Sequence, residues 1–411
     1  MRECHCDVTQ LSWQLRSSSS FRDARGETDK RWLGTAYSSA DEHQKHAVRR
    51  PIEHFSPPPS RAMSRAVDRA QARVVRSLMR APEAVVRRLG GTPSRNVYGA
   101  ALDAHAQLLA RLQSVAARPG YYEGTAAHAR REFKLGFAVV EAPPPAGVTR
   151  TERYVDGAVS ARRAFVYTPS ETRAAMPALI YFHGGGFVVG DLDAYDAGCR
   201  AIAEEAGIMV ISVDYRLAPE HRFPAAVDDG LAAFRWVAAH AAQLGLDPKR
   251  IAVGGDSAGG NVAAVTCLRA RDEGGPRPCF QWLLYPATDM TRALASHREH
   301  AAGPFLDAPT IDWFLDNYLA PTDDRRDPRA SPLFAASHAE LPPTYLLVAG
   351  FDPLRDEGLA YAEKLRAASV PVTLVHAMTM VHGFIAMCGV VPAGLAIRRN
   401  AIEVLRRALH D

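Results

Sequence analysis

The sequence predicts an α/β fold built on a largely parallel sheet, and two observations carry that prediction. From about residue 133 onward, short apolar segments alternate with segments of helical periodicity. Several of the apolar segments are nearly continuous, as expected for parallel strands that helices cover on both faces. Alternation of strands and helices favours right-handed crossover connections within one sheet.

The elements of this sheet follow one another along the chain. The expected strands are Arg162–Thr168, Ala178–His183, Met209–Tyr215, Arg250–Gly254, Gln281–Pro286, Thr344–Gly350 and Val372–Ala377. The expected helices lie around residues 225–243, 258–272, 356–368 and 393–409. The stretch from Asp289 to Leu341 offers no strand. Because a long insertion in an α/β domain usually carries a function, we expect this one to cover a site.

Two helices are expected ahead of the sheet. The apolar stripe of the first, from Met63 onward, consists of Val67, Val74, Val75 and Leu78, opposite a face rich in arginine. The stripe of the second consists of Tyr98, Leu102, His105, Leu109, Leu112 and Val115, and Pro119-Gly120 ends it. A basic amphipathic helix can bind a membrane surface. Since the first helix lacks Trp and Phe anchors, we expect it to pack on a domain instead.

Residues 1–62 differ from the rest of the chain. Only 11 of these 62 residues are Val, Ile, Leu, Met, Phe or Trp, and the segment contains the runs Ser17–Ser20 and Pro57–Pro59. Such a segment buries too little apolar surface to offset its conformational entropy. We therefore predict a disordered N-terminal extension over residues 1–62. Cys4 and Cys6 flank a histidine there, but the further ligands of a metal site are missing, so we interpret them as incidental thiols.

Composition excludes several classes of protein. Of the 411 residues, 47% are hydrophobic and 23% charged, which is ordinary for a globular protein. No window of 18 uncharged apolar residues and no apolar segment of a signal peptide is present, so we expect no membrane anchor and a cytoplasmic location. The net charge of +4 is spread along the chain, which argues against a nucleic-acid partner. Six cysteines without metal-ligand spacing fit a reducing compartment and no metal.

The sharpest motif is a G-x-S-x-G at Gly255–Gly259. It follows the expected strand Arg250–Gly254 and opens a helix, which is the strand–turn–helix context of a nucleophile elbow. In that turn the serine adopts a strained conformation that exposes its hydroxyl oxygen, and the flanking glycines remove side chains that would clash. We therefore predict that Ser257 is a nucleophile.

Three consecutive glycines follow the strand that ends at His183. They could serve only as a flexible turn, but they also let backbone N–H groups approach a ligand. Acyl transfer needs such donors for the negative oxygen of its tetrahedral intermediate. We predict that Gly185, Gly186 and Ala258 donate these N–H groups and that His183 is a scaffold residue.

A serine hydroxyl needs a general base, which a carboxylate holds in turn. In the order Ser, Asp, His, the acid should follow a strand after Ser257. Asp352 lies at the end of the strand Thr344–Gly350, whereas its rival Asp356 lies where a helix cap is expected. His382 follows the next strand, so we predict the pair Asp352 and His382. We interpret His376 and His410 as core or surface residues.

Together these motifs resemble a known family. The blocks His183–Gly186, Asp214–Glu220, Gly255–Gly260 and His382–Phe384, with Asp352, are similar to those of the hormone-sensitive-lipase-like (type IV) bacterial carboxylesterases of the α/β-hydrolase superfamily. The resemblance covers about residues 130–411, and the expected helices at 63–117 look like the N-terminal cap of that family. The block Asp214–Glu220 looks structural in the family.

The resemblance implies an α/β-hydrolase fold, with a mostly parallel eight-stranded sheet, helices on both faces and a helical cap. It assigns residues 131–411 to the catalytic domain, and residues 63–130 and an insertion at about 289–341 to the cap. It implies hydrolysis of short- to medium-chain carboxylic esters by the Ser-His-Asp triad through an acyl-enzyme, with no cofactor and no metal.

The substrate is less sharply determined. Near the cap, the candidate walls of the pocket are Phe187, Phe305, Trp313 and Phe314, each of which could instead only pack cap against core. An amidase, a lactonase or a deacetylase would use the same triad. A small-molecule receptor resembling the plant gibberellin receptor would lack the catalytic histidine, and His382 argues against it. The expected partner is a small-molecule ester, and a homodimer stays open.

Overall fold

The computed structural model describes residues 72–116 and 120–411. The expected disordered extension over residues 1–62, with Cys4 and Cys6, lies outside the described residues. So do Pro119 and the beginning of the helix expected from Met63, of which residues 72–78 are described as helical.

The described residues form a mostly parallel sheet of eight strands in the order β1-β2-β4-β3-β5-β6-β7-β8. The strands are β1 (Thr149–Val155), β2 (Arg162–Thr168), β3 (Met176–Phe182), β4 (Met209–Val213), β5 (Leu246–Asp256), β6 (Gln281–Leu284), β7 (Thr344–Phe351) and β8 (Val372–Val381). Only β1 with β2 and β2 with β4 pair antiparallel. Every strand expected from the sequence is present, and the parallel α/β prediction is confirmed.

β1 is the strand that the sequence analysis missed. It lies at the edge of the sheet, and all of its residues except Val155 are exposed or half-exposed. Its Arg and Glu side chains show no alternation of apolar and polar residues, because both faces of this edge strand are exposed to solvent. The central strand β3, by contrast, is buried along its whole length.

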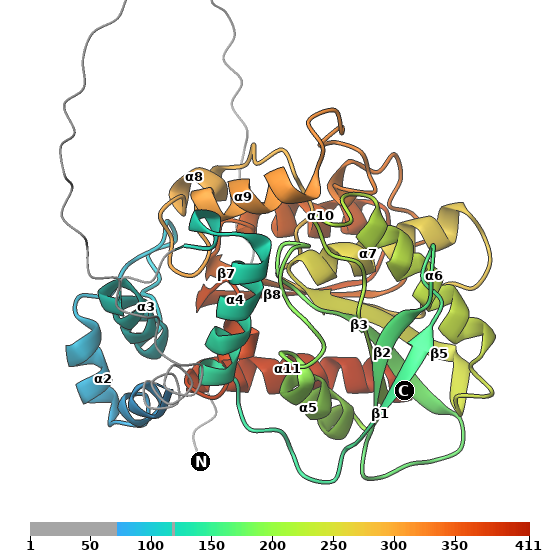
Figure 1. Ribbon diagram of the computed structural model, residues 1–411, viewed down its shortest axis with the longest axis horizontal. Helices are drawn as coiled ribbons and strands as arrows, with labels where there is room; N and C mark the ends of the chain where they lie inside the picture. The colour runs from blue at the N-terminus through green and yellow to red at the C-terminus, as the bar shows by residue number, and fades with distance from the viewer. Residues whose placement is uncertain (1–71, 117–119) are drawn as a thin grey trace, which may run out of the picture. The chain divides into compact units, whose positions relative to one another are not determined.

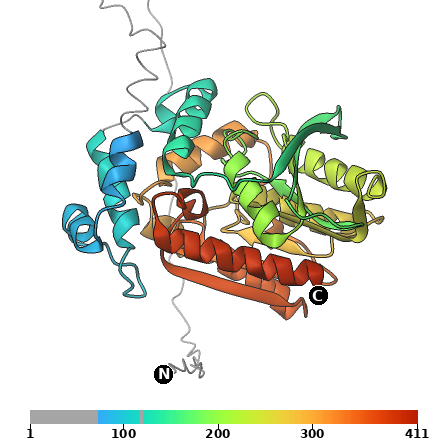
Figure 2. The same cartoon turned by 90° about the horizontal axis from the view of Figure 1, so that it is seen from below.

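Helices cover both faces of the sheet (Figures 1 and 2). One face is covered by α6 (Ala225–Ala239), α7 (Ala258–Asp272) and α10 (Arg355–Ala367), and the other by α5 (Asp196–Ala206) and α11 (Pro392–His410). Along β3, Ile180 joins the first core and Leu179 the second, because successive strand side chains point to opposite faces. This burial on both faces explains the continuous apolar runs.

The N-terminal helices differ from the prediction. They are α2 (Glu83–Gly90), α3 (Ala104–Ala116) and α4 (Ala126–Val140), with the 3-10 turn η1 (Tyr121–Glu123) between the last two. The sequence analysis predicted none of the helices α2, α4 and α5. α3 begins at Ala104 rather than near Tyr98, because the Asp103 carboxylate caps it by accepting from the N–H groups of His105 and Ala106.

The apolar stripe expected for the first helix is also wrong in part. Val74 is 59% exposed, whereas Arg76 from the supposed polar face turns inward. The Arg76 guanidinium donates to the carbonyls of Ala138 and Val139, at the end of α4. Because carbonyls at a helix end lack partners within the helix, the hydrogen bonds from Arg76 stabilise the end of α4.

The long insertion contains no strand, as predicted, and its elements are helical. They are α8 (Ala295–Glu299), α9 (Ala308–Tyr318) and the 3-10 turn η2 (Pro332–Phe334); a further 3-10 turn, η3 (Phe384–Met387), precedes α11. In Figure 1 α8 and α9 lie beside the upper end of α4. Among the helices of the described residues, none combines the length and apolar character needed to cross a bilayer.

Candidate active site

Ser257 occupies the turn between β5 and α7. Its φ of 55° and ψ of −119° fall outside the regions that non-glycine residues favour, as a nucleophile elbow requires. The Ser257 N–H donates to the Leu284 carbonyl at 2.9 Å, which ties the turn to β6. A side chain at Gly259, two residues after the serine, would collide with the carbonyl of Phe182. Glycine is therefore needed there for α7 to approach β3 closely.

A chain of hydrogen bonds connects the three predicted residues. His382 Nε2 lies 2.9 Å from Ser257 Oγ, and His382 Nδ1 lies 2.8 Å from Asp352 Oδ2. Asp352 is fully buried, and its other oxygen accepts the N–H of Leu354 at 2.8 Å. In the neutral histidine, an Nδ1–H donated to the carboxylate leaves the Nε2 lone pair facing the serine hydroxyl.

The rivals of these residues lie elsewhere. Asp356 accepts from the N–H of Ser296 at 2.9 Å and from the Arg355 guanidinium at 2.7 Å, so both of its oxygens are engaged. His376 lies on β8 against the ring of Tyr98, and burial lowers the pKa of His376. His410 contacts the carbonyl of Ala206 at the end of α5.

The glycine loop after β3 presents free N–H groups. Gly185 and Gly186 have φ values of 119° and 58°, which favour glycine. Within the described part of the chain, no hydrogen bond uses the N–H of Gly185, Gly186 or Ala258. His183 is fully buried and stacks on Tyr215, whose hydroxyl donates to the His183 carbonyl at 2.6 Å.

Asp256 is a residue of the site to which the sequence analysis gave no role. Its carboxylate accepts from the N–H of Gly184 at 2.9 Å and from the hydroxyls of Tyr181 and Tyr195 at 2.8 and 3.1 Å. Burial raises the pKa of Asp256. The residue before the nucleophile thus anchors the glycine loop. Its only sequence signal was a charged residue in a motif otherwise made of small residues.

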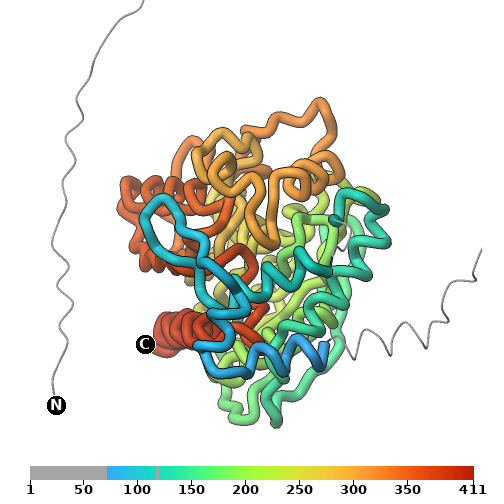
Figure 3. Tube along the Cα trace, turned by 90° about the vertical axis from the view of Figure 1, so that its left-hand side faces the viewer, coloured from blue at the N-terminus to red at the C-terminus, as the bar shows by residue number. Residues whose placement is uncertain are grey.

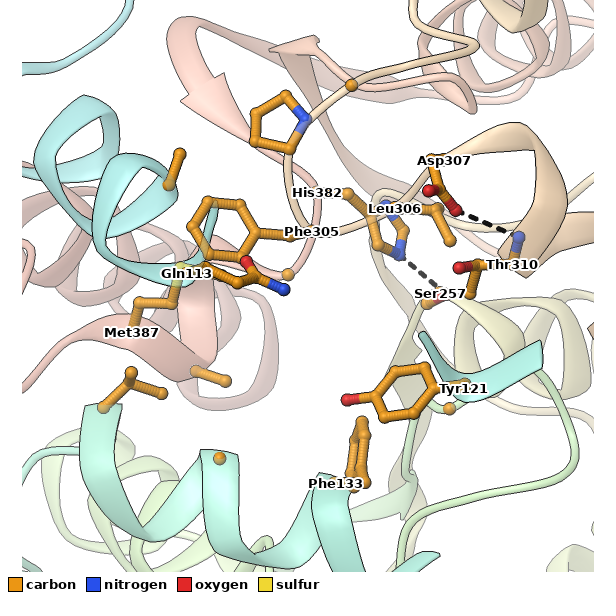
Figure 4. Close-up of a pocket in the computed structure, with 18 of the residues that line it drawn as sticks. Gln113, Tyr121, Phe133, Ser257, Phe305, Leu306, Asp307, Thr310, His382 and Met387 are labelled. Atoms are coloured by element: carbon orange, nitrogen blue, oxygen red, sulfur yellow. Dashed lines mark hydrogen bonds between the residues drawn. The ribbon is translucent and has the colours of Figure 1, made fainter. Parts of the chain in front are cut away.

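A cavity of about 1670 Å³ opens above Ser257 and His382 (Figure 4). Of the four candidate wall residues, Phe187, Phe305 and Phe314 line it. Trp313 does not; it packs against Phe314 from outside, with ring centroids 5.4 Å apart. The cavity side of α9 is formed by Thr310, Ile311, Phe314 and Leu315, and Trp313 lies off that side of the helix.

The N-terminal helices α3 and α4 and the 3-10 turns η1 and η3 also line the cavity. Figure 4 shows Gln113 of α3, Tyr121 of η1, Phe133 of α4 and Met387 of η3 around the same space. Burial raises the pKa of Tyr121 to about 12, so its hydroxyl stays protonated as a hydrogen-bond donor. The aromatic and apolar walls favour an apolar ligand with a few polar contacts. Over residues 72–116 and 120–411, no three His, Cys, Asp or Glu side chains are grouped so as to hold a metal ion.

The fold and the hydrogen-bonded Ser, His and Asp define a protein of the α/β-hydrolase class. A family model described as the alpha/beta hydrolase fold matches residues 179–386. The esterase LipI of Mycobacterium tuberculosis is 48% identical over 259 residues, which cover 62% of this chain and 81% of LipI. The ethyl acetate hydrolase of Pseudomonas putida is 38% identical over 271 residues, which cover 64% of this chain and 84% of that hydrolase.

Solved structures agree. An ester hydrolase from the metagenome of Lake Arreo, solved with a derivative of bipyridine phosphonate, matches with a TM-score of 0.73 at 42% identity, covering 74% of this chain and 98% of that one. The chain therefore belongs to the α/β-hydrolases, and within them to the hormone-sensitive-lipase-like carboxylesterases, which are carboxylic ester hydrolases.

Proposed function

We propose that this protein is a serine carboxylesterase that hydrolyses short- to medium-chain esters through an acyl-enzyme. The single observation that carries the proposal is the hydrogen-bonded chain Ser257–His382–Asp352, with distances of 2.9 and 2.8 Å. Membership in a carboxylesterase family supports the same reaction.

In the proposed first step, Ser257 Oγ attacks the ester carbonyl while its proton passes to His382 Nε2. The carbonyl π electrons move to the oxygen, which becomes an oxyanion. The buried Asp352 carboxylate stabilises the imidazolium that forms and keeps the ring in the required tautomer. When the tetrahedral intermediate collapses, the C–O bond to the alcohol breaks and His382 returns the proton to the leaving alkoxide. Water then attacks the acyl-enzyme by the same route, releasing the acid and restoring Ser257.

The oxyanion is proposed to accept hydrogen bonds from the N–H groups of Gly185, Gly186 and Ala258. These groups are otherwise unused among the described residues, so they need no rearrangement before the reaction. Removal of one fixed donor of this kind typically raises the barrier by about 3–4 kcal/mol. Asp256 supports them, since it holds the neighbouring Gly184.

The proposed substrate is a neutral ester with apolar acyl and alcohol groups. The aromatic side chains of Phe187, Phe305 and Phe314 support this choice, and a relative named ethyl acetate hydrolase supports a short acyl group. An amidase, a lactonase or a deacetylase would use the same groups. The receptor alternative is disfavoured by the contact between His382 and Ser257.

We propose that residues 63–130 and 289–341 form the cap over a catalytic domain spanning residues 131–411. Residues from both segments line the cavity, including Gln113 and Phe305. We also propose a cytoplasmic location, in keeping with the free thiols of Cys199, Cys267, Cys279 and Cys388. A homodimer remains a prediction that gel filtration would test.

The direct test is hydrolysis of p-nitrophenyl acetate and butyrate by wild type and by Ser257→Ala. The expected result is a loss in kcat of about 10⁶, since the nucleophile and its base act as a unit. Equal rates for the two proteins would refute the serine mechanism. A panel of acyl lengths, with an anilide and a lactone, would separate esterase from amidase and lactonase activity. Paraoxon should inactivate the wild type with one equivalent bound at Ser257.

A further inference from the structure

A segment between α2 and α3 lies against the ends of β7 and β8. Figure 3 shows this cyan loop beside the red part of the tube. The N–H of Asp103 donates to the carbonyl of Thr379 at 2.9 Å, and the ring of Tyr98 meets His376 edge-on at 5.5 Å. The Arg355 guanidinium lies 5.0 Å from the centre of the Tyr98 ring. The N-terminal part of the chain is thus joined to the strand ends that precede Asp352 and His382.

The pairing of β7 with β8 is irregular at this point. Ala349 pairs with Ala377, but Phe351 pairs with Val381, so the segment 378–380 of β8 faces Gly350 alone. The two strands come very close there, because a Cβ on Gly350 would lie 2.6 Å from the carbonyl carbon of Met378. Such a bulge bends its strand and redirects the side chains that follow. His382 is the residue directly after this bulged strand.

The side chain of Asn96 bridges the two strands at the bulge. Its amide nitrogen donates to the Met378 carbonyl at 2.9 Å and, more weakly, to the Gly350 carbonyl at 3.4 Å. Its amide oxygen accepts the N–H groups of Tyr98 and Ala100, both at 3.1 Å. Asn96 is only 7% exposed, and these four contacts use both donors and both acceptor sites of the amide.

We propose that Asn96 is a positioning residue for the pair Asp352 and His382. Its amide holds the bulge between their strands, and the bulge sets how His382 is placed between the carboxylate and the serine. This inference rests on the proposed function. It follows from the register shift and from hydrogen bonds to residues two before Asp352 and four before His382. An unpaired carbonyl at the bulge would let both strand ends relax, and small displacements of reacting groups cost much of their rate.

Two variants separate the donor role of Asn96 from its role in its own loop. Asn96→Ala removes every side-chain contact, whereas Asn96→Asp keeps an oxygen for Tyr98 and Ala100 but loses the donor to Met378. For both variants we expect kcat to fall about 10-fold to 100-fold, with KM on p-nitrophenyl butyrate nearly unchanged. The rate of inactivation by paraoxon should fall in parallel, since it depends on the same serine and histidine.

Gln281→Ala is the matched control. Gln281 is a buried amide that donates to Thr344 Oγ1 at 2.7 Å and to the Pro342 carbonyl at 3.4 Å, beside the opposite end of β7. We expect it to lower the melting temperature while kcat stays near the wild-type value. All assays are run on the full-length chain, well below each melting temperature.

Three results would overturn the inference: wild-type kcat in both Asn96 variants, a loss confined to Asn96→Ala, or an equal loss of kcat in Gln281→Ala. Failure of the proposed function looks different, because wild type itself would then hydrolyse no faster than Ser257→Ala. If Asn96→Ala does not fold, Asn96→Asp alone decides between the outcomes.

Discussion

Replacing Gly185 by alanine would test the proposed oxyanion donors. Gly185 has a φ of 119°, and an added Cβ would lie 2.7 Å from the carbonyl carbon of Val189 and closer still to its oxygen. The Gly185 carbonyl also accepts the N–H groups of Val188 and Val189, at 3.0 and 2.9 Å, so neither side can move alone. Relieving the collision requires the loop to shift by about 1 Å, which is enough to remove a donor from the oxyanion.

Loss of one such donor costs about 3–4 kcal/mol, so kcat for p-nitrophenyl acetate should fall roughly 10²-fold to 10³-fold, with little change in KM. Gly245→Ala is the control, because Gly245 also has a positive φ, of 71°, but a Cβ there would meet no atom within 4 Å. It should cost about 1 kcal/mol of stability and leave kcat unchanged. A folded Gly185→Ala enzyme with the kcat of wild type would refute this reasoning.

Three further predictions concern the acid, the pH dependence of stability and the pocket. Asp352→Asn should lower kcat by about 10⁴, because an amide at this position stabilises the wrong tautomer of His382. Asp356→Asn should keep most of the activity. Steady-state kinetics in which Asp356→Asn loses more activity than Asp352→Asn would show that the acid is misassigned. Burial raises the pKa of Glu141 from 4.5 to about 7, so the folded state holds this proton more tightly than the unfolded state. The protonated Glu141 carboxyl therefore adds to the free energy of unfolding below about pH 4.5, and this contribution is lost as the pH rises through about 7. In urea unfolding, Glu141→Gln should reduce this loss of unfolding free energy between low and neutral pH by about 3 kcal/mol. The same pH dependence in wild type and Glu141→Gln would contradict the assignment. Phe314→Ala should raise kcat/KM for bulky esters relative to acetate by about 10-fold, while Trp313→Ala should not; equal effects on the selectivity ratio would place both rings in the pocket.

The elements that the sequence predicted well are those with local signals. The buried strands of the sheet show continuous apolar runs, and the turn around Ser257 needs glycines within a few residues of the nucleophile. β1 was missed because it is exposed along most of its length and so has no apolar alternation. α5 does have an amphipathic pattern, with Cys199, Ile202, Ala203 and Ala206 buried, and the sequence analysis overlooked it.

The site was predicted less completely than its motifs suggest. Asp256 and Asn96 hold the glycine loop and the bulge, yet neither belongs to a pattern that reports its partners. Two residues of the first helix depart from its expected faces: Val74 is exposed, and Arg76 turns inward to donate to the carbonyls of Ala138 and Val139 at the end of α4. Trp313 was placed in the pocket only because of its aromatic character.

By itself the sequence determined the α/β class, the candidate nucleophile, the order of acid and base, and the glycine loop. These depend on backbone geometry within a few residues, which composition and spacing record directly. The sequence also favoured Asp352 over Asp356, because only Asp352 directly follows a strand. Only the tertiary structure decided that Asn96 reaches the carbonyl of Gly350, 254 residues further along the chain, and that Trp313 lies outside the cavity. Such contacts arise when strand ends and loops pack together, and hydrogen-bond partners at that separation leave no local trace in the sequence.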